Sequence, residues 1–103
     1  MVKDLKVKVV KIKGDCPVYN IGDTFSIKNG YKLNSEKELC MHSLASILPY
    51  YNALSRGITA DQLGLSKNND KEKSYLQCLD PCDYTGGGTV IMEVSITNES
   101  LKT

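Results

Sequence analysis

The fold of this chain is decided by residues 35–57, SEKELCMHSLASILPYYNALSRG, which carry its long helical pattern. Ser35 and Glu38 have the spacing of a capping box, in which each side chain satisfies a free backbone N–H at a helix start. Gly57 provides a stop, because glycine enters the left-handed conformation at no steric cost. Pro49 should kink or split the helix, because it lacks an N–H and crowds the preceding turn. We therefore predict one central helix with a break near Pro49.

One face of this helix is apolar. At ~100° per residue, apolar side chains recur along a single stripe that should pack on the rest of the protein. Leu48 borders the stripe, and a cysteine heads it. The stripe consists of Cys40, Leu44, Ile47, Tyr51 and Leu54.

The remaining segments read as strands and turns. Alternating apolar residues predict strands at 5–13, 24–28, 75–79 and 89–97. Asn29-Gly30 predicts a hairpin, and a change of phase near Val9 and Val10 predicts a β-bulge. Residues 82–88 should form a long turn, and we expect the tail from Asn98 to fray.

These elements predict an α+β fold in a single domain spanning residues 1–103. We expect a small antiparallel sheet, or a partly closed β-barrel, with one kinked central helix packed across it. The core is expected to contain Phe25, Ile27, Leu44, Ile47, Leu48, Tyr51, Leu76, Val90, Met92 and Val94.

Composition excludes several classes of partner. The chain has 13 Lys and Arg against 12 Asp and Glu, a net charge of +1, so no long-range field attracts nucleic acid or anionic lipid. Its apolar runs are too short to cross a membrane, and residues 1–13 do not resemble a signal peptide. We therefore expect a cytoplasmic protein, and a protein partner or a homo-oligomer stays open.

The four cysteines are the strongest indication of a functional site in this sequence. Cys16 follows a predicted strand, Cys40 lies near the helix start, and Cys78 and Cys82 flank an Asp-Pro turn. The Cys78-x-x-x-Cys82 spacing suits one half of a metal chelate. Free cysteine also packs as a small hydrophobic residue, so from spacing alone buried reduced thiols are favoured over metal ligation or a disulfide.

The histidine and the glycine-rich segment are weaker indications of a functional site than the cysteines. His42 should lie ~200° around the helix from Cys40, so the two face one metal only if the helix begins later than Ser35. A solvated or capping histidine is therefore expected. Gly86-Gly87-Gly88 lacks the Lys and Ser or Thr of a phosphate loop and should be a flexible turn.

Three segments together resemble a family of small, largely uncharacterised prokaryotic proteins of about this length. The resemblance covers most of the chain and implies that Cys16, Cys40 and Cys78 belong to the family pattern, with Cys82 an addition. It brings no established reaction. The segments are Gly14-Asp15-Cys16-Pro17 with Gly22-Asp23-Thr24-Phe25, Cys40 with Leu48-Pro49-Tyr50-Tyr51, and Cys78-Leu79-Asp80-Pro81.

With this resemblance, metal ligation and buried structural thiols become equally favoured interpretations. The first hypothesis is an iron–sulfur cluster or zinc bound by Cys16, Cys40 and Cys78, with Cys82 as an auxiliary ligand, in electron transfer or sulfur handling. The alternative is a non-catalytic structural or interaction module with buried reduced cysteines. The sequence leaves open whether the protein is an enzyme.

Overall fold

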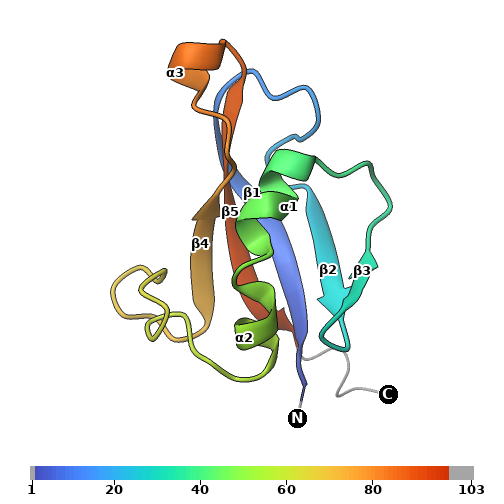
Figure 1. Cartoon of the computed structure of the whole chain (residues 1–103), viewed down its shortest axis with the longest axis vertical. Helices are drawn as coiled ribbons and strands as arrows, with labels where there is room; N and C mark the ends of the chain where they lie inside the picture. Colours follow the sequence, from blue (N-terminus) through green and yellow to red (C-terminus); the bar gives the residue numbers. More distant parts are fainter. Residues whose placement is uncertain (1, 98–103) are drawn as a thin grey trace.

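The computed structural model describes residues 2–97, which form a five-stranded antiparallel sheet with three short helices (Figure 1). The strand order is β3-β2-β1-β5-β4, so the sheet is open, with β3 and β4 at its edges. The predicted α+β fold is confirmed, in its open-sheet form rather than as a partly closed barrel. The elements are β1 (Asp4–Gly14), β2 (Thr24–Lys28), β3 (Lys32–Asn34), α1 (Met41–Ile47), α2 (Tyr51–Ser55), β4 (Lys73–Gln77), α3 (Cys82–Thr85) and β5 (Gly88–Thr97).

The strands follow the alternation in the sequence. β2 has the predicted bounds, and the register of β1 on β5 shifts between Val9 and Lys11, which confirms the bulge. The β2–β3 hairpin turns at Asn29 and Gly30, with φ of 56° and 82°. These positive angles are why an Asn-Gly pair is suited to the turn. β4 lies two residues earlier than predicted, and the expected turn over 82–88 contains the short α3.

The central helix begins later than the capping box predicts. Ser35 Oγ accepts a hydrogen bond from Lys37 N at 3.1 Å and donates to Lys37 O at 2.7 Å, so its side chain serves a local turn. Serine that bonds its own neighbouring backbone in this way competes with helix formation. Cys40 is extended, with φ −88° and ψ 128°, and the first helical residue is Met41. The prediction of a helix start at Ser35 is therefore wrong.

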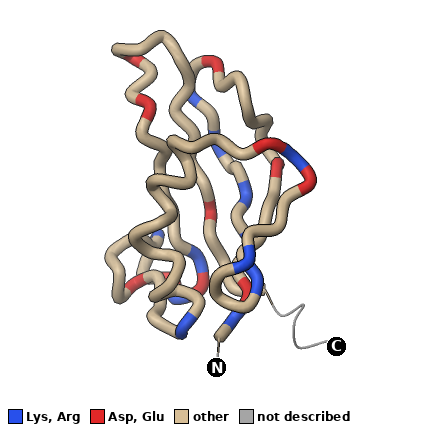
Figure 2. Tube along the Cα trace, turned by 45° about the vertical axis from the view of Figure 1, so that its right-hand side comes forward, with Lys and Arg blue, Asp and Glu red and all other residues tan. Residues whose placement is uncertain are grey.

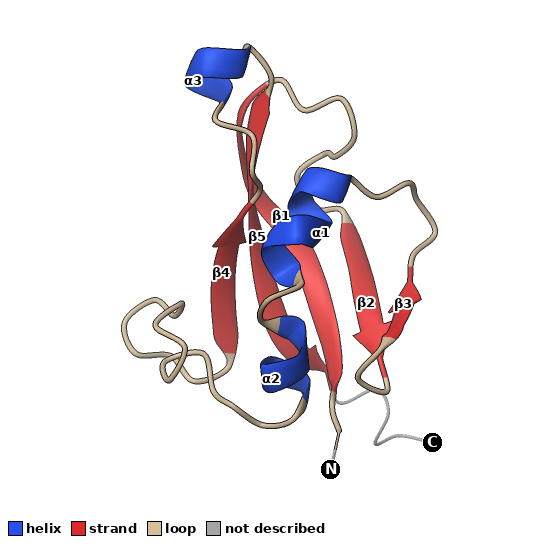
Figure 3. Cartoon of the chain, viewed as in Figure 1, coloured by secondary structure: helices blue, strands red, loops and turns tan. Residues whose placement is uncertain are grey.

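The predicted break and stop are both present. α1 and α2 are separate helices on either side of Pro49, and both lie across one face of the sheet (Figure 3). Beyond α2, Gly57 adopts φ 102°, and Ile58 N donates to Ala53 O at 3.0 Å. Gly57 N also donates to Leu54 O at 3.3 Å, which completes a Schellman motif.

The core lies between the sheet and the two central helices. The predicted core residues on the strands are all buried, and so is Ile47 on α1. Leu44 and Tyr51 are half-buried, whereas Leu48 is 61% exposed, so its predicted place in the core is wrong. Leu48 is the C-cap of α1, at the border of the stripe, and its side chain is left exposed there. The core also contains several buried residues outside the predicted set, namely Leu5, Val7, Val9, Tyr19 and Leu54.

Basic and acidic positions are interspersed along the described chain (Figure 2), and their totals nearly balance, with a net charge of +1 for the full sequence. Within residues 2–97, the structure contains no helix that is both long and apolar enough to cross a membrane. The predicted fraying of the tail from Asn98 lies outside the described residues.

Candidate functional site

A cavity of about 200 Å³ lies at one end of the core, where three segments distant in sequence meet. Cys16, Cys40 and Cys78 all line it, and we call it the thiol cavity. Because cysteine is one of the rarer residues of the chain, the meeting of three at one cavity is the main feature of the site. Its full lining is Cys16, Pro17, Val18, Tyr19, Cys40, His42, Cys78, Asp80, Gly88 and Val90.

Each of these cysteines lies just beyond or before a regular element. Cys16 is in the loop after β1, Cys40 is the N-cap of α1, and Cys78 directly follows β4. Cys78 is buried, whereas Cys16 and Cys40 are half-buried and pack against the core. All are free thiols. Their position at element ends is the one predicted from the sequence, and it allows several loops to bring sulfur to one cavity.

Backbone groups hold two of the sulfurs. Tyr19 N donates to Cys16 Sγ at 3.3 Å, and Val90 N donates to Cys78 Sγ at 3.2 Å. The Cys78 thiol in turn donates to Gly88 O at 3.6 Å. Backbone N–H groups that donate to sulfur are partners that also support and orient a metal-bound thiolate. The surroundings therefore suit both a packed thiol and a coordinating one.

Tyr19 connects the loop that carries Cys16 to the start of α1. Besides the contact of its backbone with Cys16, its Oη accepts a hydrogen bond from Cys40 N at 3.0 Å. Its hydroxyl also lies 2.6 Å from Ser43 Oγ, which donates to Cys40 O at 2.7 Å. Tyr19 and Ser43 are both buried. Because every polar atom of this network has a partner, it fixes the backbone of Cys40 in the extended form.

The other candidate residues separate into two groups. His42 and Asp80 are on the wall of the thiol cavity, but Cys82 is not among the described residues that line it. Cys82 begins α3, and its backbone N–H donates to Thr89 Oγ1 at 3.1 Å. The auxiliary role expected for Cys82 stays a prediction. Whether any of the four cysteines binds a metal stays a prediction.

Two contributors to the site carry no clear signal in the sequence. Tyr19 is one of six tyrosines, and no local signal separates it from the exposed ones. A helix begun at Ser35 would direct His42 away from Cys40, so the sequence pattern does not predict it as a ligand. With Cys40 extended and α1 begun at Met41, both residues reach the same cavity.

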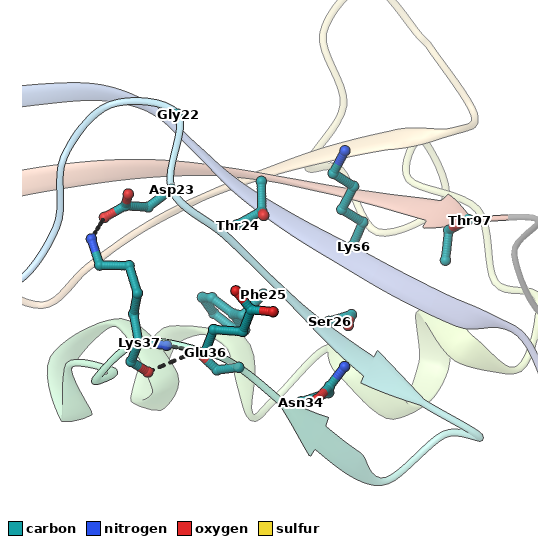
Figure 4. Close-up of a pocket in the computed structure, with 11 residues that line it drawn as sticks. Lys6, Gly22, Asp23, Thr24, Phe25, Ser26, Asn34, Glu36, Lys37 and Thr97 are labelled. Carbon is teal, nitrogen blue, oxygen red and sulfur yellow. Dashed lines mark hydrogen bonds and ion pairs between the residues drawn. The ribbon is translucent and has the colours of Figure 1, made fainter.

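A larger groove of about 490 Å³ lies over the outward face of β1 and β2 (Figure 4). Lys6, Thr24 and Ser26 are among its polar lining, and at one end Lys37 forms an ion pair with Asp23. The backbone N–H of Asn20, with help from Lys37, holds the pKa of Asp23 below its ordinary value. The groove contains hydroxyl, amide and paired charged groups but no cysteine or histidine, so we place the candidate site at the thiol cavity.

Comparisons with protein-family models, with curated proteins and with solved structures found no match. The family resemblance therefore stays a prediction. Among the described residues, no group of three or more His, Cys, Asp or Glu is arranged to hold a metal ion as it stands. Coordination at the thiol cavity would thus require its side chains to move.

Proposed function

We propose that the protein binds a metal, as an iron–sulfur cluster or zinc, through Cys16, Cys40 and Cys78. The observation that carries this proposal is that these cysteines, from three distant segments, line one cavity while Cys82 lies outside it. Thiolates are the ligands that zinc and iron–sulfur clusters share. Three of them leave one position of a tetrahedral centre for another ligand.

Metal binding would involve rotation of the cysteine side chains. A cysteine sulfur turns about a single bond between staggered rotamers, so its position can change while the backbone stays in place. Cys16 lies in a loop and Cys40 at a helix cap, and both are half-buried. Cys78 would lose its bond to Gly88 O on deprotonation and keep the one from Val90 N.

Such a site fits electron transfer or sulfur handling in a reducing compartment such as the cytoplasm, where thiols stay reduced. A metal-bound sulfur cluster carries electrons, and an open coordination position accepts a sulfur-containing ligand. A protein partner or a second copy of the chain would then exchange electrons or sulfur with it.

A second function is favoured by a different observation. Cys78 belongs to the hydrophobic core, and Cys16 and Cys40 pack against it. Free cysteine fills such positions as a small apolar residue. In this case the protein is a structural or interaction module, and its thiols contribute only packing.

Metal content separates the two proposals. We expect the full chain, purified without air, to contain zinc by elemental analysis, or iron and sulfide with visible absorbance above the aromatic band. Single Cys16→Ser, Cys40→Ser and Cys78→Ser variants should each lose most of that metal, because each removes a ligand. Cys82→Ser is the matched control and should retain it. Colourless, metal-free protein would favour the structural module, and equal loss from all four variants would make Cys82 a ligand.

A further inference from the structure

His42 is the one imidazole of the chain, and it lies on the wall of the thiol cavity. It is the second residue of α1, two positions after Cys40. Its side chain is exposed, so the imidazole lies at the mouth of the cavity. Within the part of the chain that the structure describes, no hydrogen bond or ion pair engages this ring. Both ring nitrogens are therefore available to a ligand.

The placement of His42 follows from the hydrogen bonds that surround Cys40. Tyr19 Oη receives the backbone N–H of Cys40, and Ser43 Oγ donates to the Cys40 carbonyl. With Cys40 held extended, the helix cannot begin before Met41. The usual angular separation of two helical residues then no longer applies to Cys40 and His42, and both face the cavity.

Tyr19 and Asp80 are the other ionisable side chains with an oxygen on the wall, and both are already engaged. The Tyr19 hydroxyl contacts Cys40 N and Ser43 Oγ. The Asp80 carboxylate accepts a hydrogen bond from Thr85 Oγ1, and the Asp80 backbone carbonyl accepts one from Thr89 Oγ1 at 2.6 Å. These contacts tie Asp80 to α3 and the start of β5. His42 is thus the free candidate for a fourth ligand beside three cysteines.

We infer that His42 completes a mononuclear zinc site with Cys16, Cys40 and Cys78, an inference that rests on the proposed metal binding. Three thiolates and one imidazole are an established tetrahedral donor set for structural zinc. Iron–sulfur clusters mostly take cysteine alone, so a histidine at the fourth corner favours zinc. On binding, the three thiols release their protons to solvent, and the neutral imidazole donates a nitrogen lone pair.

The test uses the reduced full chain, freed of metal by a chelator and titrated with Co²⁺ and then Zn²⁺ under nitrogen. Cobalt in a tetrahedral thiolate site gives visible ligand-field bands and a sulfur-to-cobalt charge-transfer band that strengthens with each thiolate. We expect both for the parent protein. His42→Ala should weaken zinc binding by about tenfold or more, since even an outer partner of a ligand is worth that much.

A second variant tests the role of His42 by a gain in the cobalt spectrum rather than by a loss of zinc affinity. His42→Cys offers a fourth thiolate, so it should retain tetrahedral cobalt and strengthen the charge-transfer band. Met41→Ala is the matched control, because Met41 is the neighbouring residue, is 72% exposed and does not line the cavity. It should leave affinity and spectrum unchanged.

The outcomes distinguish the role of His42 from the binding of metal by the three thiols. If the parent protein binds metal but His42→Ala matches it in affinity and spectrum, the role of His42 is overturned and thiol ligation survives. The same holds if the protein assembles an iron–sulfur cluster that His42→Ala retains. If the parent protein binds neither ion, both the role of His42 and the proposed metal site are overturned.

Discussion

Replacing Ile47 with alanine is expected to lower the free energy of unfolding by about 2–5 kcal/mol, because it removes a buried branched side chain and leaves a cavity. Ile47 is only 2% exposed and belongs to the core between α1 and the sheet. The neighbouring Leu48→Ala should change the same quantity by less than about 0.5 kcal/mol, the range of most surface substitutions. Urea or guanidinium titration of the three proteins measures both differences.

Comparison of the Ile47→Ala and Leu48→Ala variants shows which side of α1 packs on the sheet. Leu48 is 61% exposed, although the apolar stripe in the sequence runs beside it. The two residues are adjacent, aliphatic and of the same volume, so Leu48→Ala is a matched control for side-chain size. A larger loss for Leu48→Ala than for Ile47→Ala would mean that α1 is rotated from the orientation described.

Gly88→Ala is expected to destabilise the protein by about 1–3 kcal/mol or more and to displace Cys16, because the added methyl group has no room. A Cβ at Gly88 would lie 2.5 Å from Cys16 N and 2.7 Å from the carbonyl carbon of Asp15. Both are backbone atoms, so a side-chain rotation cannot relieve the contact. The start of β5 and the loop after β1 must separate. Thermal or denaturant unfolding gives the first quantity, and the alkylation rate of Cys16 reports the second.

Gly86→Ala provides the control for this prediction. A Cβ at Gly86 meets nothing within 4 Å, but φ is 74°, so the variant bears only the cost of a left-handed alanine, roughly 1–2 kcal/mol. It should leave the alkylation rate of Cys16 unchanged. If Gly88→Ala also leaves that rate unchanged, the close packing of Gly88 against the Cys16 segment is contradicted.

The strands could be predicted from the sequence because their signals are local. Alternation fixes which residues of β5 face the core, and the phase change near Val9 marks the bulge. The Asn29-Gly30 hairpin and the stop at Gly57 depend on positive φ angles that those residue types favour. Each of these features needs only a few neighbouring residues.

The start of α1 could not be predicted, because a tertiary contact decides it. Ser35 has the right spacing for a cap, but its side chain bonds Lys37, and the hydroxyl of Tyr19 holds Cys40 extended. Tyr19 is 21 residues before Cys40, beyond the reach of a helix pattern. The same contact places His42 at the thiol cavity, a position that a helix begun at Ser35 would not give it.

The sequence suggested that three cysteines could lie near one another, but it did not show which other side chains line the thiol cavity. Cys16, Cys40 and Cys78 each border a predicted element, which suggested that loops could bring them together at one end of the sheet. The structure brings these three to one cavity. Which side chains fill the space between them depends on packing across the chain, and the sequence carries no local signal for it.

The central claim is that Cys16, Cys40 and Cys78 act together on one metal. Its most direct test is alkylation of the native protein with iodoacetamide, with and without one equivalent of Zn²⁺, and location of the label by tandem mass spectrometry. We predict that zinc slows alkylation of these three cysteines in parallel and leaves the rate at Cys82 unchanged, because a bound thiolate is withdrawn from reaction. Rates that zinc does not change, or protection that extends equally to Cys82, would contradict the account.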